Sequence, residues 1–542
     1  MIAKNTTEQV RAESRATIAA IKEHGKQCVR KLAEITNGTK SSVHRHLQAK
    51  EQRNQHPESA LWETEAGDAW LRLMVFSTLY HFGLKCGVGA DNLSQYFEMI
   101  RIQTHVGVSP SALLGQMKKM ELLLPKFQEE CEKNVAKTLR QSVVAMDETF
   151  FGDFLILVLM DLRSGYLLLE EISDDRRYDT WYEKTAPRLE SLGIEVNHAI
   201  SDRAKALIKL AITGFECDSG ADVFHAQQDV SRLLGATLAR RTSTTKKEFE
   251  AAEEAEKNAI ETETGYKEIA VIERSLDAEE DFNKAQQVQA EYHENLQGIA
   301  EEIHPFSLDD NSIKDAEQVE TELEERAQAF EKIAQEQEIN DKRETMKKFR
   351  NQIKPMASTV SFWWLWVRET LQGLAVNTEL ENWLTTILLP VVYWHHQMHK
   401  TQNNRTRKKY RKAWQQAIHA FNAHPFSLTL PESEIQNWLA WAESMSRQFH
   451  RSSSAVEGRN GCLAQMYHNG RGLSERRLQA LTVIHNYGIK RGDGTTAAMR
   501  FFETDFPDLF SWLLDEMGEL PLPRKRRERV VRNPLKLINV PA

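Results

Sequence analysis

The sequence lacks any run of about 18 consecutive apolar residues, which is the length that a membrane-spanning helix needs. Its first residues, MIAKNTTEQVRAESR, also lack the apolar segment of a secretory signal. We therefore expect a soluble, cytoplasmic protein without a membrane partner.

Cysteine is scarce as well. The five cysteines are odd in number and scattered, and no two of them form a CxxC pair. This pattern argues against a disulfide framework and against a structural zinc site, and it is typical of proteins from a reducing compartment.

Positive charge is in deficit over the chain as a whole, because the formal net charge is -8. The deficit is local: residues 243–340 carry a net charge of -19, so the remainder carries -8 minus -19, or +11. An acidic insert thus interrupts a basic protein, and only the basic part has the charge of a nucleic-acid binder.

At 542 residues, the chain is long enough for three or four structural units.

Residues 7–50 predict a small helical unit. A polar helix over 7–24 is followed by CVRKLAEIT, a turn at Asn37-Gly38-Thr39, and KSSVHRHLQAK. Two short helices around a glycine-bearing turn are typical of a helix-turn-helix. Hydrogen-bond donors suited to DNA lie on the second helix, among them Ser42, His44 and Arg45. The alternative is a three-helix bundle with a basic surface. Residues 91–120, with a helix start at Ser109-Pro110, are a second DNA-binding candidate or a helical linker.

The spacing of apolar residues changes at residue 141 from a helical period to short continuous runs, which predicts strands. SVVAMDETFF, FLILVLMDL and YLLLEEI form three short apolar runs, followed by a helix over 179–192, a fourth strand EVNHAIS and a fifth strand ADVFHA. A further helix is expected from about Gln228. This order, three antiparallel strands and then crossovers to parallel ones, resembles the ribonuclease H-like fold.

The acidic insert predicts two long amphipathic helices in an antiparallel, coiled-coil hairpin joined at Pro305, with a structural or partner-binding role. Beyond it, KTQNNRTRKKYRKAW places Lys408 and Lys409 beside Tyr410 and Trp414. Basic residues interleaved with aromatic ones suit phosphate contact with base stacking. A solvated basic helix is the alternative.

Three carboxylates stand out by their placement. Asp147 lies within an apolar strand, where a charge is costly to bury unless it is paired or bound to a cation. Asp202 ends the fourth strand, where it is also a natural helix N-cap. The first and fourth strands are neighbours in the expected topology, so the two carboxylates should converge. Glu457, in RSSSAVEGRN, begins a late helix; it is either a third ligand or a first-turn acid that complements the helix dipole.

Other polar groups lie near these carboxylates. Arg459 and Asn460 directly follow Glu457 and are expected to reach phosphate. Glu148 should point to the opposite face of its strand, whereas Asp161 is a substitute ligand if the register differs. His225, on the expected fifth strand, is either a phosphate or water contact or a core histidine.

MDETFF, ISDRAKAL and SSSAVEGRN together resemble the pattern of DDE transposases of bacterial insertion sequences. The resemblance covers roughly 141–240 and 450–502 and implies a ribonuclease H-like catalytic domain with an all-helical insertion. It makes Asp147, Asp202 and Glu457 the catalytic residues and the ligands of two Mg²⁺ or Mn²⁺ ions. It further implies double-stranded DNA, both transposon ends and target, as partner, a homodimer or larger homo-oligomer, and a place at the bacterial nucleoid.

Two other functions remain open at this point: a catalytically inactive, transposase-derived DNA-binding regulator, and a ribonuclease H-like nuclease that cuts without joining.

The basic segment RKRRERVVR, over 524–532, has a net charge of +5 and is expected to bind phosphate. The predicted domains are 1–55 (helix-turn-helix), 56–140 (helical linker or second DNA-binding region), 141–242 (catalytic, first part), 243–450 (all-helical insertion), 451–505 (catalytic, last part, with Glu457) and 506–542 (basic tail).

Overall fold

The computed structural model describes residues 7–25, 27–53, 55–135, 139–152, 154–262, 266–450 and 454–523. The chain divides into two compact units, which are described separately: Met1–Ala136 with Cys462–Ala542, and Lys137–Gly461. Within the described residues, no helix is both long enough and apolar enough to cross a bilayer. The basic segment 524–532 lies outside the described residues.

The first unit is helical. Its amino-terminal segment forms α1 (Thr7–His24), α2 (Val29–Ile35) and α3 (Lys40–Arg53), as the sequence predicts for these residues. The three helices share a small core of Ala20, Leu32, Ala33 and Val43. Asn37, in the turn between α2 and α3, has a φ of 53°, a left-handed conformation that asparagine tolerates better than most residues.

The rest of this unit packs around one long helix, α6 (Pro110–Asn134). The predicted helix start is confirmed, because the Ser109 side chain accepts a hydrogen bond from the backbone N–H of Ala112 and Pro110 follows it. Its other elements are η1 (Pro57–Glu63), α4 (Glu65–Thr78), η2 (Leu79–Lys85), α5 (Ala90–Met99), η6 (Tyr467–Arg471), α20 (Glu475–Val483), η7 (Ile484–Gly488), α21 (Ala497–Phe502) and α22 (Leu509–Met517).

The second unit contains a mixed five-stranded sheet. Its strands are β1 (Arg140–Phe151), β2 (Phe154–Asp161), β3 (Leu167–Ser173), β4 (Ile194–Ser201) and β5 (Asp218–Ala221), in the order β3-β2-β1-β4-β5. β1, β2 and β3 are antiparallel neighbours, whereas β4 runs parallel to both β1 and β5. The predicted three-stranded meander, and the pairing of the first strand with the fourth, are confirmed. α7 (Tyr178–Leu192) matches the predicted helix, and α8 (Lys205–Lys209) and η3 (Leu210–Gly214) lead to β5.

The predicted fifth strand, ADVFHA over 221–226, lies too late in the sequence and overlaps the observed strand only at Ala221. β5 ends at Ala221, and α9 (Val223–Val230) begins where the sequence predicted strand. Asp222 decides the boundary, because its side chain accepts a hydrogen bond from the backbone N–H of Phe224 at 2.8 Å and thereby caps the helix. His225 therefore lies in the first turn of a helix, and the β-branched and aromatic residues before it misled the prediction.

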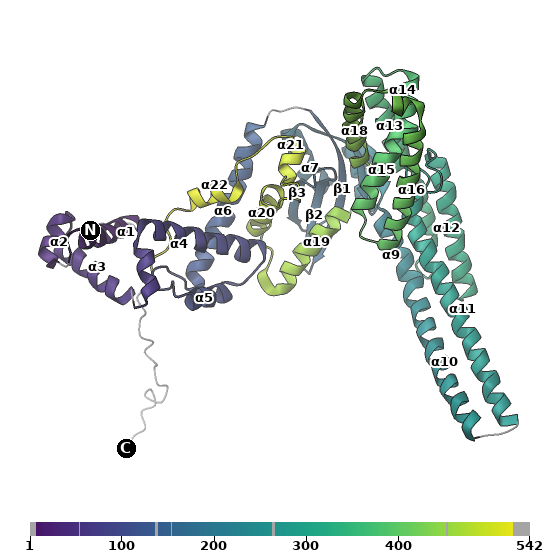
Figure 1. Cartoon of the computed structure of the whole chain (residues 1–542), viewed down its shortest axis with the longest axis horizontal. Helices are drawn as coiled ribbons and strands as arrows, with labels where there is room; N and C mark the ends of the chain where they lie inside the picture. The colour runs from purple at the N-terminus through teal and green to yellow at the C-terminus, as the bar shows by residue number, and fades with distance from the viewer. Residues whose placement is uncertain are drawn as a thin grey trace. The chain divides into compact units, whose positions relative to one another are not determined.

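The acidic insert is also longer than predicted. α9 continues through η4 (Ser231–Gly235) into α10 (Ala236–Thr262), which packs along α11 (Tyr266–Glu302); these two form the long hairpin in Figure 1. The helices on either side of Pro305 are α11 and α12 (Ala316–Glu336), so the insert has three long helices rather than two. The predicted boundary at residue 243 falls inside α10. The sequence changes from basic to acidic within this helix, so the change in net charge does not mark where the helix begins.

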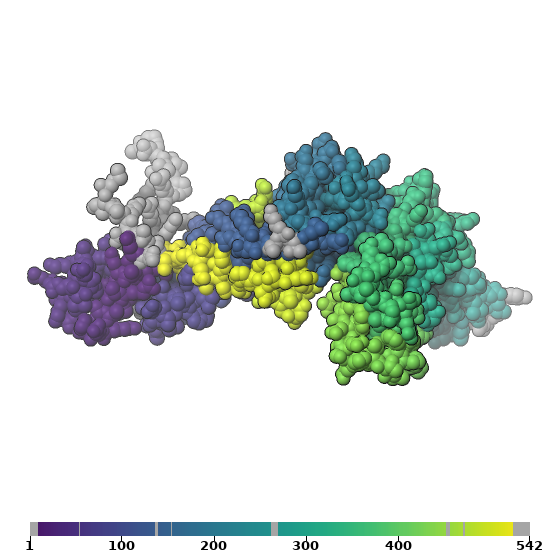
Figure 2. Space-filling model, turned by 90° about the horizontal axis from the view of Figure 1, so that it is seen from above, coloured from purple at the N-terminus to yellow at the C-terminus, as the bar shows by residue number. Residues whose placement is uncertain are grey.

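The remaining helices enclose an aromatic core. They are α13 (Thr345–Gly373), α14 (Thr378–Trp383), η5 (Leu384–Leu388), α15 (Leu389–Lys400), α16 (Asn404–Ala423), α17 (Pro425–Thr429) and α18 (Glu432–Arg447), before α19 (Ser454–Met466). The green residues of these helices form one contiguous surface in Figure 2. Trp363, Tyr393 and Phe449 pack against one another in the core beneath it.

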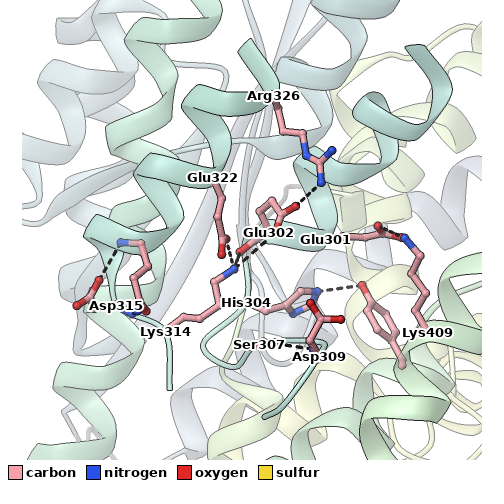
Figure 3. Close-up of polar contacts among 12 residues, drawn as sticks. Glu301, Glu302, His304, Ser307, Asp309, Lys314, Asp315, Glu322, Arg326 and Lys409 are labelled. Atoms are coloured by element: carbon pink, nitrogen blue, oxygen red, sulfur yellow. Dashed lines mark hydrogen bonds and ion pairs between the residues drawn. The ribbon is translucent and has the colours of Figure 1, made fainter. Parts of the chain in front are cut away.

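The connection between α11 and α12 contains buried polar groups (Figure 3). The His304 imidazole is fully buried and lies between the hydroxyls of Tyr393 and Tyr410, the latter at 3.0 Å. Lys314 is also buried and binds the backbone carbonyl of Glu302 at 2.8 Å and the carboxylate of Glu322. Tyr410 is therefore a core residue, and the prediction that it stacks on bases is wrong.

A buried histidine on β4 should make stability depend on pH. The His198 ring stacks on Phe362 with centroids 4.7 Å apart, and its two ring nitrogens have no hydrogen-bond partner among the described residues. Burial lowers the pKa of His198 from 6.5 to about 4, so the unfolded chain takes up this proton first as the pH falls. The resulting loss of stability should therefore begin below pH 6.5 and grow until about pH 4.

We predict that His198→Phe, which cannot be protonated, flattens this acid loss. Between neutral pH and pH 4, the free energy of unfolding, measured in urea, should fall by up to about 3 kcal/mol less in the variant than in the wild type. His419→Gln, at an exposed site in the same unit, should leave the profile unchanged. Parallel profiles for wild type and His198→Phe would contradict the prediction.

Candidate functional site

One face of the sheet is covered by α19. The strand register places Asp147 beside Val158, and Val158 beside Glu170, so these three side chains share that face. From α19, Arg459 donates two hydrogen bonds of 2.7 Å to the Glu170 carboxylate, and the Asn460 side-chain amide donates one of 2.7 Å to Asp147. Two polar contacts thus hold the helix on the sheet.

Three side chains from distant segments meet beside these contacts. Ligand atoms of Asp147 on β1, His225 on α9 and Glu457 on α19 all lie within 4.8 Å of one another. His225 Nε2 and Glu457 Oε1 are 3.2 Å apart. Asp147 is buried, whereas His225 and Glu457 are half-buried, so the group is open to solvent on one side.

Asp202 directly follows β4. The register pairs Val144 with Ala199 and Ala145 with Ile200, and its continuation by two residues brings Asp202 opposite Asp147. The Asp202 carboxylate accepts the backbone N–H of Ala204 at 2.9 Å. This bond makes a local turn before α8, but the N-cap of α8 is Ala204, so Asp202 is not the helix N-cap that the sequence offered as the alternative. Asp202 is also not one of the three groups within 4.8 Å.

The turn after β4 is held by its neighbours. Arg203 adopts a φ of 63°, a region that side-chain-bearing residues seldom occupy. Its guanidinium donates to the backbone carbonyl of Ser219 at 2.7 Å, and its backbone N–H donates to Ser201 Oγ at 3.1 Å. These bonds fix the backbone next to Asp202.

The carboxylates and the imidazole of this group shift one another's pKa values. Burial raises the pKa of Asp147 to about 7, and the nearby carboxylates of Glu457 and Asp202 add to the shift. Burial also disfavours protonation of His225, but its contact with Glu457 and the charges of Asp222 and Asp147 outweigh it and raise the pKa of His225 to about 9. The site therefore brings together carboxylates that repel one another, and the protonated His225 offsets part of their charge.

Asp147, Glu457 and His225 are the residues that could hold a metal ion. Their ligand atoms already converge, and two carboxylates with an imidazole suit Mn²⁺ or another borderline divalent ion as well as the harder Mg²⁺. Asp202 is close enough for its charge to act on Asp147.

Two competing carboxylates are accounted for by other contacts. Glu148 points to the opposite face, as predicted, where it accepts hydrogen bonds from the Trp181 indole at 3.3 Å and from Arg176 at 3.1 Å. Asp161 is fully buried and accepts from Ser142 and Ser164, which stabilises the β2–β3 connection. Neither carboxylate joins the cluster.

Two residues predicted to reach phosphate have other partners. Arg459 is buried against Glu170, with side chains that are 6% and 0% exposed, so this structure does not present its guanidinium to a ligand. Asn460 is buried and orients Asp147. Glu170 was missed from the sequence. Its signal was a charged residue within the apolar run YLLLEEI, the same burial argument that selected Asp147.

The remaining predicted contact residues differ in exposure. On α3, His44 and Arg45 are exposed, whereas Ser42 is half-buried and donates a hydrogen bond of 2.5 Å to Glu13 on α1. On α16, Lys408 is exposed, and Lys409 pairs with the buried Glu301 at 2.6 Å. Ser42 and Lys409 are therefore engaged within the protein.

A family model matches part of the chain. Residues 384–529, a little over a quarter of the chain, match a family described as a family of unknown function (DUF6399). The matched segment includes Glu457 and excludes the sheet. No curated protein matches the chain.

The buried pair between Arg459 and Glu170 should dominate the stability of this face. We predict that Arg459→Met lowers the free energy of unfolding by about 3–5 kcal/mol, because it leaves the Glu170 carboxylate buried without its partner. In chemical denaturation, the double variant Glu170→Met/Arg459→Met should be more stable than this single variant. Arg411→Met, at an exposed position on α16, is the control. A double variant less stable than Arg459→Met would argue against the pair.

Proposed function

We propose that this protein is a transposase that catalyses metal-dependent cleavage and strand transfer at transposon ends, with Asp147, Asp202 and Glu457 as its catalytic residues. The observation that carries the proposal is the convergence of Asp147 and Glu457, which are 310 positions apart in the sequence (457-147=310), on one face of a mixed sheet. The strand order β3-β2-β1-β4-β5, with its antiparallel meander and parallel crossovers, supports a ribonuclease H-like fold for this sheet.

The geometry suits phosphodiester chemistry. Two divalent ions bound at such a site activate the attacking oxygen and stabilise the leaving oxygen. The protein's part is to hold ligands rigidly: Asn460 orients the Asp147 carboxylate, and the bonded turn at Arg203 fixes Asp202. His225 supplies positive charge between Asp147 and Glu457, and we propose that it shares this site and holds or releases a proton as ligands bind.

The amino-terminal helices support a DNA-binding role. α2 and α3 flank a short turn in the manner of a helix-turn-helix, and His44 and Arg45 on α3 are exposed. We propose that α3 reads double-stranded DNA at transposon ends. Because two ends must be joined, the active form would be a homodimer or larger assembly at the bacterial nucleoid.

The proposal predicts Mg²⁺- or Mn²⁺-dependent cleavage and joining of DNA that bears the terminal repeats flanking the gene. Asp147→Asn, Asp202→Asn and Glu457→Gln should each reduce the rate by at least about a hundredfold while DNA binding persists, because each removes a metal ligand. Gel-based assays with radiolabelled ends measure both steps. Glu195→Gln, an exposed carboxylate on β4, is the matched control and should retain full activity.

The outcomes of this assay separate three functions. Cleavage without joining would identify a nuclease, and sequence-specific binding without either step would identify an inactive regulator. Full activity in any one carboxylate variant would remove that residue from the site.

Metal binding can be measured without DNA. We predict that saturating Mn²⁺ stabilises the wild type, by about 2.7 kcal/mol at a free metal concentration of 100 times Kd, because the ion binds the folded state alone. Asp147→Asn and Glu457→Gln should lose this stabilisation in thermal unfolding, and Glu195→Gln should keep it. Equal stabilisation of all the variants would place the metal elsewhere.

A further inference from the structure

The acidic insert contains two basic stretches. Residues 231–247 hold five basic residues and no acidic one, and residues 340–350 hold five basic and two acidic residues. They are more than 90 positions apart, in an insert whose net charge over 243–340 is -19. A concentration of positive charge against this background needs an explanation beyond solubility.

The fold brings the two stretches together. They line a groove between the α9–η4–α10 run and the segment that precedes α13, and its basic lining residues are Arg232, Arg241, Lys342 and Arg343. A second hollow adjoins the first, because Arg241 lines both, and it adds Arg240. All five basic side chains are exposed.

These basic side chains lack anionic partners. Arg241 donates to the neutral amide of Gln337 at 2.7 Å and so keeps its full charge. For Arg232, Lys342 and Arg343, the described part of the chain supplies no side-chain hydrogen bond or ion pair. Unpaired guanidinium groups gathered at one groove suit an external polyanion.

The acidic residues of the first groove are largely neutralised already. Asp229 pairs with Lys348 at 2.5 Å. The Asp341 carboxylate accepts the backbone N–H of Met346 at 2.8 Å, at the start of α13, where the helix dipole compensates its charge. Only Glu338 remains as an exposed acid, so the groove is positive where a ligand would enter.

We propose that this groove binds the phosphate backbone of the duplex DNA on which the catalytic site acts. This inference rests on the proposed function. His225 lies in the first turn of α9, and α9 continues through η4 into α10 (Figure 1). Arg232 and Arg240 follow His225 by 7 and 15 positions (232-225 and 240-225). At about 1.5 Å per residue, the run from His225 to Arg240 extends about 22 Å, the length of six or seven base pairs.

Arginine and lysine side chains that contact only phosphate bind DNA of any sequence. The groove should therefore add affinity rather than specificity. Each phosphate contact contributes about -0.9 to the slope of log K against log salt concentration. The salt slope therefore counts the contacts that a variant loses.

The test is a binding titration with a fluorescently labelled 40-base-pair duplex at several salt concentrations. Arg232→Gln/Arg343→Gln should weaken binding about tenfold or more at low salt and make the slope shallower by about 2, for duplexes of any sequence. The matched control Lys257→Gln/Arg274→Gln removes the same charge from exposed sites on α10 and α11 away from the groove, and should leave the slope unchanged. Circular dichroism verifies that both double variants fold.

Catalysis separates this inference from the proposed function. If the wild type cleaves DNA and the groove variant has an unchanged Kd and slope, the groove assignment is overturned while the proposed function stands. If the wild type neither binds nor cleaves DNA, both fail. With saturating DNA, the groove variant should cleave at the wild-type rate, because its carboxylates are intact. Competition by poly-glutamate as strong as that by duplex DNA would overturn DNA as the ligand in favour of an acidic protein.

Discussion

The bidentate pair between Arg459 and Glu170 is the contact on which the candidate site depends. It joins residues 289 positions apart, and both side chains are removed from water. Such a pair recovers its desolvation cost only if geometry and hydrogen bonding are nearly ideal, so it tolerates little displacement of α19. Glu457 lies on the same helix, half a turn from Arg459. The position of Glu457, a candidate metal ligand, is thus set by Arg459, which need not contact the metal.

The helical insertion satisfies its own polar groups. The paired Glu301 and Lys409, the His304 imidazole between two tyrosine hydroxyls, and the buried Lys314 at Glu322 bring α11, α12, α15 and α16 together at one junction. These groups lie among tightly packed aromatic rings, where an unpaired polar atom would be costly. The insertion therefore satisfies these buried polar groups with its own residues, while its apolar core extends to the sheet at Ala221 of β5.

Much of the sheet was predictable, because its strands are short apolar runs separated by clear turns, and the pairing of β1 with β4 followed from topology. The start of α9 was not, because Val223 and Phe224 favour strands and only the hydrogen bond from Phe224 to Asp222 shows that a helix has begun. Nor was the burial of Tyr410, since a basic helix with interleaved aromatics has the same sequence whether those rings face solvent or a core. For the site, charge in apolar strands indicated Asp147. The partners of Arg459 and Asn460 required tertiary contacts that no local pattern encodes.

The separation of Glu170 from Arg459 also has a consequence for biosynthesis. A ribosome completes all five strands long before it reaches α19, so during that interval the nascent sheet has two acidic side chains on one face and no cover for them. Their burial must wait until α19 is synthesised, whereas the helices of the insertion, whose core is largely their own, can pack earlier. The order of synthesis therefore keeps the acidic site unassembled until the last helix of this unit emerges. A chain released early would carry folded helices but no closed site.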